Sequence, residues 1–385
     1  MSEAFIPYGC QDIGEADVAA VLAVLQSDWL TQGPAVPAFE AAVAGRCGVP
    51  YGVAACNATA ALHIACLALG VGPGDLVWTS PNTFVASANC ARYCGADVDF
   101  VDIDPATLNL DVRLLEAKLE AAAGHGRLPK VVIPVHFAGQ PCDMARLAAL
   151  GETYGFRIIE DASHAIGATY QGEPVGNCRY SDITVFSFHP VKIVTTAEGG
   201  MAMTRDAALA QTLAELRSHG ITREASRLRE PSHGPWYYEQ IALGFNYRLT
   251  DLQAALGTSQ LARLDQFLAR RHELVARYDR LLADLPVTRP HLAPGRTSAW
   301  HLYCIRVDAA RRAAVFDALR TAGIGANVHY IPVHTQPDYR RLGFAWGDFP
   351  VAEQYYREAI TLPLHPRLTD EQQDRVVRVL AGALA

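Results

Sequence analysis

Phe186-Ser-Phe-His-Pro-Val-Lys192-Ile-Val-Thr-Thr-Ala-Glu-Gly-Gly-Met201 is the stretch that decides how this chain folds and which chemistry it supports. Its lysine, Lys192, follows a short apolar β-type run and precedes a threonine pair and a glycine pair. Burial disfavours the ammonium form, so a lysine among hydroxyls, glycines and aromatic rings can lose its proton. A neutral amine is what covalent chemistry with an aldehyde requires. This segment alone leaves an ordinary surface lysine beside a turn equally open.

A second segment favours the reactive lysine. Phe156-Arg-Ile-Ile-Glu-Asp161-Ala-Ser-His164 has the pattern of an apolar strand that ends in acids and a histidine. Ligands of open α/β sheets lie outside the carboxyl ends of the strands, so Asp161 and Lys192 should face one crevice. A lysine for the aldehyde and a carboxylate for the pyridinium nitrogen are what a protein contributes to pyridoxal phosphate chemistry. Taken alone, Asp161 would be interpreted as a helix N-cap.

Helix-type and strand-type segments alternate along the chain, which favours a mostly parallel sheet with crossover helices. Helical patterns cover Asp12–Leu25, Ala58–Leu69, Leu252–Leu282 and Arg311–Ala322. Strand patterns cover Leu76–Thr79, Val98–Val101, Val131–Val135, Arg157–Glu160, Ile183–Phe188 and Trp300–Val307. The charged segment from Thr222 to Pro235 is predicted to be a long mobile loop.

A phosphate group would have to be held without the usual glycine-rich loops, because neither a Gly-x-Gly-x-x-Gly fingerprint nor a Walker loop occurs. Asn57-Ala58-Thr59 stands directly before a predicted helix. Backbone N–H groups and a hydroxyl at a helix N-terminus suit a phosphate monoester. The same residues could also cap the helix without any ligand.

Composition limits the possible functions. With 385 residues and 50% hydrophobic content, the chain should form a large domain (1–250) and a smaller one (251–385). A net charge of −7 offers no electrostatic footprint for nucleic acid. No apolar run is long enough to span a membrane, and the polar start lacks the features of a signal peptide. Nine scattered cysteines indicate reduced thiols in the cytoplasm.

The chain resembles the DegT/DnrJ/EryC1/StrS family of pyridoxal-phosphate sugar aminotransferases over almost its whole length. The resemblance is carried by Ile6–Gly9, Ser27–Pro34, Thr79–Ala86, Pro134–Asp143, Phe186–Lys192, Leu243–Asp251 and Val328–His334. It implies an α/β protein with the PLP-dependent transferase fold type I (aspartate aminotransferase-like). In that fold a large domain with a mixed, mostly parallel sheet is followed by a smaller C-terminal α/β domain.

The resemblance also implies residue roles. The implied catalytic residues are Lys192, which binds the cofactor aldehyde and moves a proton, Asp161, which pairs with the pyridine nitrogen, and His164, near the phenolic oxygen. The implied cofactor-binding residues are Asn57, Ala58, Thr59 and Ser187 at the phosphate, Phe84 against the ring, together with Asp161, His164, Lys192 and Asn246. The implied substrate-binding residues are Tyr8, Asp28, Trp29, Leu30, Thr31, Asn327, Val328, His329 and Tyr330. Phe84 could equally be a core residue, and each aromatic residue of the substrate segments a core or interface residue.

Asn246 matches a residue that reaches the cofactor phosphate of a neighbouring subunit, which implies a homodimer with shared active sites. The implied reaction moves an amino group from L-glutamate to C4 of a UDP-4-keto-6-deoxy-N-acetylhexosamine. Another nucleotide-linked keto sugar is the nearest alternative, since residue types do not reveal sugar configuration. A dehydratase on this fold usually replaces the lysine by histidine, so Lys192 argues against that activity.

Two readings from other classes remain weaker. A metal-dependent hydrolase would need histidines such as His136, His164, His189, His329 and His334, but no pair has the His-x-x-x-His spacing of a helical site. We therefore predict no metal. A non-catalytic regulatory member of the fold would not need Asp161, Ser187 and Lys192 together.

One position departs from the family pattern. Many relatives have Thr-Thr-Gly-Glu-Gly-Gly after the lysine, whereas this chain has Ala197 at the first glycine. Alanine tolerates positive φ poorly. If this position needs a left-handed conformation, the loop should differ slightly, without loss of function.

Overall fold

The segment around Lys192 borders a seven-stranded sheet in the computed structural model, which describes residues 4–385. The strands lie in the order β1-β9-β8-β5-β4-β2-β3. Their bounds are β1 Tyr51–Ala55, β2 Leu76–Thr79, β3 Asp97–Phe100, β4 Val131–Ile133, β5 Arg157–Asp161, β8 Ile183–Ser187 and β9 Gly200–Thr204. Only β9 runs antiparallel to its neighbours within this sheet. The expected mixed, mostly parallel sheet is confirmed.

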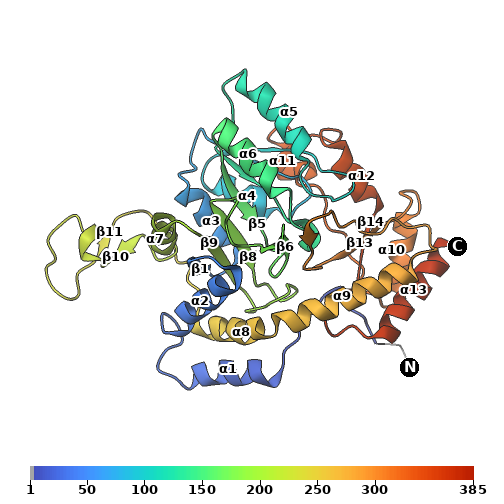
Figure 1. Cartoon of the computed structure of the whole chain (residues 1–385), viewed down its shortest axis with the longest axis horizontal. Helices are drawn as coiled ribbons and strands as arrows, with labels where there is room; N and C mark the ends of the chain where they lie inside the picture. Colours follow the sequence, from blue (N-terminus) through green and yellow to red (C-terminus); the bar gives the residue numbers. More distant parts are fainter. Residues whose placement is uncertain (1–3) are drawn as a thin grey trace.

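Helices cover both faces of this sheet (Figure 1). One face packs against α3 Ala58–Ala68, α4 Ala86–Tyr93 and α7 Ala207–Leu216, and the other against α5 Val112–Ala123 and α6 Met144–Tyr154. A central strand between them is apolar on both sides, since Val131, Val132 and Ile133 of β4 are all fully buried. Such continuous apolar runs are typical of parallel strands that are covered twice.

The long helical pattern at 252–282 forms two helices, α8 Asp251–Ala262 and α9 Leu264–Leu281. They meet at Arg263, whose backbone leaves the helical region (φ −102°, ψ 6°). There the Arg263 guanidinium donates to the backbone carbonyl of Asp12 and to the buried carboxylate of Asp17. This anchors α1 Glu15–Leu25, and α2 Ala35–Cys47 also packs against α8.

The C-terminal part has a core of its own around strands β13 Tyr303–Arg306 and β14 Ala359–Leu362. The long helix α9 extends along it, with α10 Arg312–Thr321 and α13 Asp370–Leu384 (Figure 1). Ile6 belongs to this core as well, so the N-terminal segment crosses to the C-terminal part. The division at residue 250 stays a prediction.

Shorter elements complete the chain. They are β6 Thr169–Tyr170, β7 Glu173–Pro174, β10 Ile221–Thr222, β11 Glu239–Gln240, β12 Arg296–Thr297, α11 Pro337–Arg340, α12 Pro350–Glu358 and the 3-10 turns Phe137–Gly139, Ala225–Arg227 and Val333–Thr335. Strands β10 and β11 pair in an arm, residues 219–243, that projects from the body (Figure 1). The segment predicted to be a long loop lies largely inside this arm, and its mobility stays a prediction.

Predicted strands in the sheet agree with the structure within two residues at each end, but β1 and β9 were not predicted. Their sequences, Tyr51-Gly-Val-Ala-Ala and Gly200-Met-Ala-Met-Thr, contain few β-branched or aromatic residues. Both strands form because they pair with each other, and β9 also with β8. Among residues 4–385, no helix is long and apolar enough to cross a membrane.

Candidate active site

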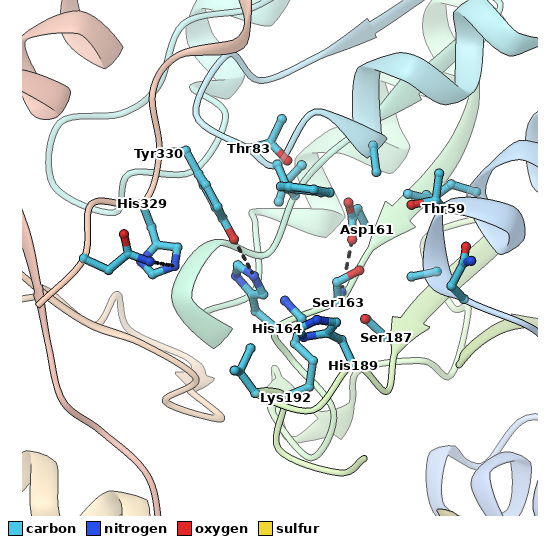
Figure 2. A pocket seen from close by; sticks show the side chains of 18 of the residues that line it. Thr59, Thr83, Asp161, Ser163, His164, Ser187, His189, Lys192, His329 and Tyr330 are labelled. Atoms are coloured by element: carbon cyan, nitrogen blue, oxygen red, sulfur yellow. Dashed lines mark hydrogen bonds between the residues drawn. The ribbon is translucent and has the colours of Figure 1, made fainter. Parts of the chain in front are cut away.

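The carboxyl ends of neighbouring parallel strands bring the predicted residues together. Asp161 ends β5 and Ser187 ends β8, and Lys192 follows in the loop after β8. A cavity of about 390 Å³ opens at this edge (Figure 2). The predicted residues that line it are Tyr8, Asn57, Ala58, Thr59, Phe84, Asp161, His164, Ser187, Lys192, Asn327, Val328, His329 and Tyr330.

One end of the cavity is the N-terminus of α3. Asn57 caps this helix, its Oδ1 accepting from the backbone N–H of Ala60 at 2.8 Å, and the role of this helix end at a phosphate stays a prediction. Strand β9 passes close by, because a Cβ on Gly200 would lie 2.5 Å from the backbone nitrogen of Ala58. The glycine therefore allows β9 to approach the first turn of α3, which offers N–H groups to an anion.

Lys192 lies half-buried in the loop between β8 and β9. Burial lowers its pKa to about 8, against the opposing effect of the negative charge of Asp161. The loop is held in place by backbone hydrogen bonds from Lys192 N to the carbonyl of His189 and from Thr196 N to the carbonyl of Phe188. About half of the lysine population is thus neutral near pH 8, where an ordinary lysine is almost fully protonated.

Asp161 is buried, and both of its carboxylate oxygens accept hydrogen bonds. The backbone N–H of Ser163 reaches Oδ1 at 3.1 Å, and the hydroxyl of Ser87 reaches Oδ2 at 2.6 Å. No helix begins at residue 162, where the chain continues in turns. The interpretation of Asp161 as a helix N-cap is therefore wrong.

His164 lies in the cavity opposite Tyr330 (Figure 2). Its Nε2 is 3.1 Å from the Tyr330 hydroxyl, while its buried Nδ1 has no hydrogen-bond partner within residues 4–385. Burial lowers the pKa of His164 well below its ordinary value, and a positive charge on Lys192 acts in the same direction. Burial also raises the pKa of Tyr330, so a neutral imidazole faces a protonated phenol.

The opposite end of the cavity is formed by Tyr8 and the segment 327–330. His329 Nδ1 is 2.9 Å from the hydroxyl of Thr361, and burial lowers the pKa of His329 to about 3. The ring of Tyr8 packs 5.3 Å from that of His329. Phe84 is 58% exposed at the cavity edge, so its interpretation as a core residue is wrong.

Five predicted residues do not line the cavity of this chain. Thr31 forms an isolated bridge with Thr250, and Trp29 and Leu30 are exposed beside it. Asn246 forms a bridge with Ser218 near the base of the arm. The substrate-binding role of Asp28, Trp29, Leu30 and Thr31, and the role of Asn246 in a neighbouring subunit, stay predictions.

Sequence reasoning missed several polar residues of the site. Thr83, Ser163 and Glu198 line the cavity, and Ser87 contacts Asp161 from outside it. His189, considered only as a metal ligand, lines the cavity as well. Thr83 lies in the loop that follows β2, so the rule that ligand-facing residues follow the carboxyl ends of strands could have found it. Ser87 lies inside α4, and nothing in its local sequence signals its contact.

Of the histidines considered as metal ligands, His164, His189 and His329 line the cavity, while His136 and His334 lie elsewhere. His136 pairs with Glu160 at 2.7 Å and His334 with Glu353 at 3.0 Å, on separate elements. Across residues 4–385, no group of three or more His, Cys, Asp or Glu side chains is arranged to hold a metal ion.

The cavity fits pyridoxal phosphate. The first turn of α3, Asn57 to Thr59, lines the cavity and offers N–H groups to a phosphate, and the absence of a side chain at Gly200 lets β9 pack directly against this turn. Lys192 has a lowered pKa, a buried carboxylate faces it, and the unpaired Nδ1 of His164 lies in the same wall. These features, on this sheet, define a class: α/β enzymes that use pyridoxal phosphate.

The comparisons with known proteins narrow this class. The sequence profile of the DegT/DnrJ/EryC1/StrS aminotransferase family matches residues 11–381, and the chain belongs to this family. The Bacillus subtilis spore coat polysaccharide biosynthesis protein SpsC is 40% identical over 383 residues, which cover 98% of this chain and 96% of SpsC.

Solved structures agree with this assignment. Helicobacter pylori PseC, an aminotransferase involved in pseudaminic acid biosynthesis, matches with a TM-score of 0.90 and 30% identity over 99% of both chains. Streptococcus pneumoniae Spr1654 in its PMP form matches with a TM-score of 0.89 and 33% identity over 98% of both chains, and its PLP form matches too. The fold expected from the family resemblance is thus confirmed. The protein is a sugar aminotransferase whose cofactor is pyridoxal phosphate.

Proposed function

We propose that this enzyme transfers the amino group of L-glutamate to C4 of a UDP-4-keto-6-deoxy-N-acetylhexosamine. The product would be UDP-4-amino-4,6-dideoxy-N-acetyl-β-L-altrosamine, a precursor of pseudaminic acid. Overall, the amino group of L-glutamate replaces the C4 ketone oxygen of the sugar. The glutamate half-reaction would consume one water and release 2-oxoglutarate, and the sugar half-reaction would release one water. Bound pyridoxal phosphate would supply the carrier for the amino group between the two.

Lys192 and Asp161 at one edge of the sheet support the transfer of an amino group, and the choice of this sugar rests on the match to PseC, with a TM-score of 0.90 and 30% identity. When bound, pyridoxal phosphate accepts the electron pair released as a proton leaves the substrate carbon. Asp161 would hold the pyridine nitrogen protonated, and Lys192 would carry the proton between substrate and cofactor carbons. A lysine pKa of about 8 suits that exchange, because both protonation states are accessible.

Three further contacts would place the cofactor. The first turn of α3 and Ser187 would hold the phosphate, since N–H groups at a helix N-terminus attract a dianion. Phe84, exposed at the cavity edge, would stack on the ring. Neutral His164 would meet the phenolic oxygen without adding a second positive charge beside Lys192.

The sugar would bind at the end formed by Tyr8 and residues 327–330. Hydroxyl, amide and imidazole groups gather there, and these donate and accept the hydrogen bonds that a hexose needs. His329 is neutral, so this end of the cavity presents hydrogen-bonding groups without charge to the ketone.

We propose a homodimer in the cytoplasm as the working form. Large apolar side chains are exposed on the arm and near α1, among them Trp236 (72%), Leu243 (82%) and Trp29 (55%). Exposed apolar groups of this size favour burial against a partner. Asn246 would then complete the phosphate site of the second subunit. Seven of the nine cysteines are buried free thiols, in keeping with a reducing compartment.

The second candidate is the same chemistry on another nucleotide-linked keto sugar, for surface polysaccharide or antibiotic sugar biosynthesis. SpsC, at 40% identity, is named for spore coat polysaccharide biosynthesis, and the matched TlmJ of Streptoalloteichus hindustanus is an aminotransferase. Both candidate functions would use the same residues at the cofactor end of the cavity, and they differ only in the sugar that the enzyme accepts.

The test is to load the protein with pyridoxamine phosphate and offer keto sugars that differ in C5 configuration and in nucleotide. We expect amination of the UDP-linked L-configured 4-keto sugar, with the product configuration read by NMR. Protein loaded with pyridoxal phosphate, which carries no amino group, is the control. Amination only of a D-configured sugar or a 3-keto sugar would contradict the first candidate and support the second.

A further inference from the structure

Two buried hydroxyls connect α4 to the carboxylate of Asp161. Ser87 Oγ lies 2.6 Å from Asp161 Oδ2, and Thr83 Oγ1 lies 2.7 Å from Ser87 Oγ. Ser87 is fully buried and Thr83 is 2% exposed, so water does not compete for these contacts. The three groups form a chain that ends at the edge of the cavity.

The positions of the hydrogens in this chain follow from simple counting. An ionised carboxylate only accepts hydrogen bonds, and it lies 2.6 Å from Ser87 Oγ while the other acceptor, the carbonyl of Phe84, lies at 3.4 Å, so Ser87 donates its one hydrogen to Asp161. Ser87 then has only lone pairs left for Thr83, so Thr83 donates to Ser87. A separation of 2.6 Å is typical of a hydroxyl that donates to a charged oxygen. Donation from Thr83 strengthens the donation from Ser87, because chained hydrogen bonds polarise one another.

Ser87 does not line the cavity, and its shortest contact with a cavity residue is the one to Asp161, so its effect on the reaction is expected to act through that carboxylate. The backbone N–H of Ser163 donates to Asp161 Oδ1. Within residues 4–385, Ser87 is the side chain that donates a hydrogen bond to this carboxylate. A hydrogen bond to a carboxylate stabilises its charged form. Without that bond, more negative charge remains on the oxygens and they attract a shared proton more strongly.

We propose that Ser87 and Thr83 are positioning residues that hold the Asp161 carboxylate by hydrogen bonds and so keep the proton that it shares with the cofactor on the pyridine nitrogen. The inference rests on the proposed role of Asp161. If the inference holds, two hydroxyls that sequence reasoning did not identify partly determine how readily the cofactor ring accepts electrons.

The test is the ¹⁵N NMR shift of the ring nitrogen in enzyme loaded with ¹⁵N-labelled pyridoxal phosphate. In Ser87→Ala we expect the shift to move toward that of a neutral pyridine. The rate constant of the glutamate half-reaction should fall about tenfold, the effect of one hydrogen bond to a charged group, with KM for L-glutamate unchanged. Thr83→Val should move the shift less in the same direction, and Thr83→Ser should restore it.

Thr204→Val is the control, because Thr204 is also a fully buried hydroxyl but donates to the carbonyl of Asp182, outside the cavity. It should leave the ¹⁵N shift unchanged. If Ser87→Ala does not fold, Thr83→Val and Thr83→Ser carry the test. Wild-type protein that loads and reacts, with the same ¹⁵N shift in every hydroxyl variant, would overturn this inference alone. Wild-type protein that does not bind the cofactor through Lys192 would contradict the proposed function as well.

Discussion

The two ends of the cavity are built in different ways. The cofactor end is formed by strand ends and a helix N-terminus of one sheet, through Asp161, Ser187 and Asn57. The sugar end is formed by Tyr8 and residues 327–330, which lie outside the sheet and come from opposite ends of the sequence. Residues at the ends of sheet strands are held in fixed positions, whereas the sequence of a loop can change without disturbing the core. We therefore expect the cofactor end to determine the reaction and the sugar end to determine its substrate.

The largest effect should come from Lys192. Lys192→Ala removes both the covalent attachment and the proton carrier, so kcat should fall at least about 10⁴-fold in steady-state assays. Lys192→Arg keeps a positive charge and should be no more active. Borohydride reduction followed by peptide mass spectrometry should find the cofactor on Lys192 in the wild type only. Substantial activity in either variant would remove the lysine from the mechanism.

Neighbouring acids on β5 allow a matched pair of variants at the cofactor end. Asp161 and Glu160 point to opposite faces because strand residues alternate, and Glu160 is bound to His136 away from the cavity. Asp161→Asn should lower kcat about a hundredfold or more, since a neutral amide cannot hold the ring nitrogen protonated. Glu160→Gln should lower the melting temperature and leave kcat near wild type. Equal losses of kcat in both variants would mean that the effect is structural.

A smaller and more selective effect is expected at the sugar end. Asn327→Ala should raise KM for the keto sugar about tenfold through the loss of a hydrogen bond. The glutamate half-reaction, measured alone by stopped-flow absorbance, should not change. A variant that slows both half-reactions equally would show that the two ends are not separable in the way proposed here.

The lowered pKa of Lys192 also predicts how stability depends on pH. The folded apoprotein releases the lysine proton near pH 8, while the unfolded chain retains it to above pH 10, so the unfolded state binds more protons between these values. Stability should therefore rise with pH across this window. Lys192→Met should remove that rise, as measured by denaturant unfolding of both proteins at several pH values. Parallel stability curves for the two proteins would contradict a depressed lysine pKa.

The smallest effect concerns Ala197, which adopts φ +66° in the loop after Lys192. This φ lies in the left-handed region, which alanine adopts poorly, so the backbone is strained at this position. Ala197→Gly should stabilise the fold by up to about 1 kcal/mol, as measured by denaturant unfolding, with activity retained. Ala121→Gly in α5 is the control and should destabilise by about 0.5–1 kcal/mol. Destabilisation in both variants would mean that Ala197 is not strained.

The cofactor end could be predicted from the sequence because its signals are local. The apolar run of β5 ends at Asp161, and the apolar run of β8 ends shortly before Lys192. The capping residue Asn57 directly precedes an Ala/Leu-rich helix. Strands β1 and β9 were missed because their small residues carry no strand pattern, and they become strands by pairing across the chain.

Contacts across long sequence separations explain the other omissions. Ser87 reaches Asp161 over 74 positions, and Tyr330 reaches His164 over 166. No rule based on sequence spacing predicts a contact between residues so far apart in the chain. Residues 28–31 are the opposite case, in which the family resemblance predicts a role in substrate binding that the cavity of this chain does not include. These residues lie beside Thr250, outside the cavity.

The most direct measurement of the central claim is the visible absorbance of the purified protein with pyridoxal phosphate, before and after L-glutamate is added. The account predicts a band from the lysine-bound cofactor that disappears as 2-oxoglutarate forms in equal amount, and that does not form in Lys192→Ala. A band that persists in excess glutamate would contradict glutamate as the amino donor, and the lack of any band would contradict the assignment of Lys192.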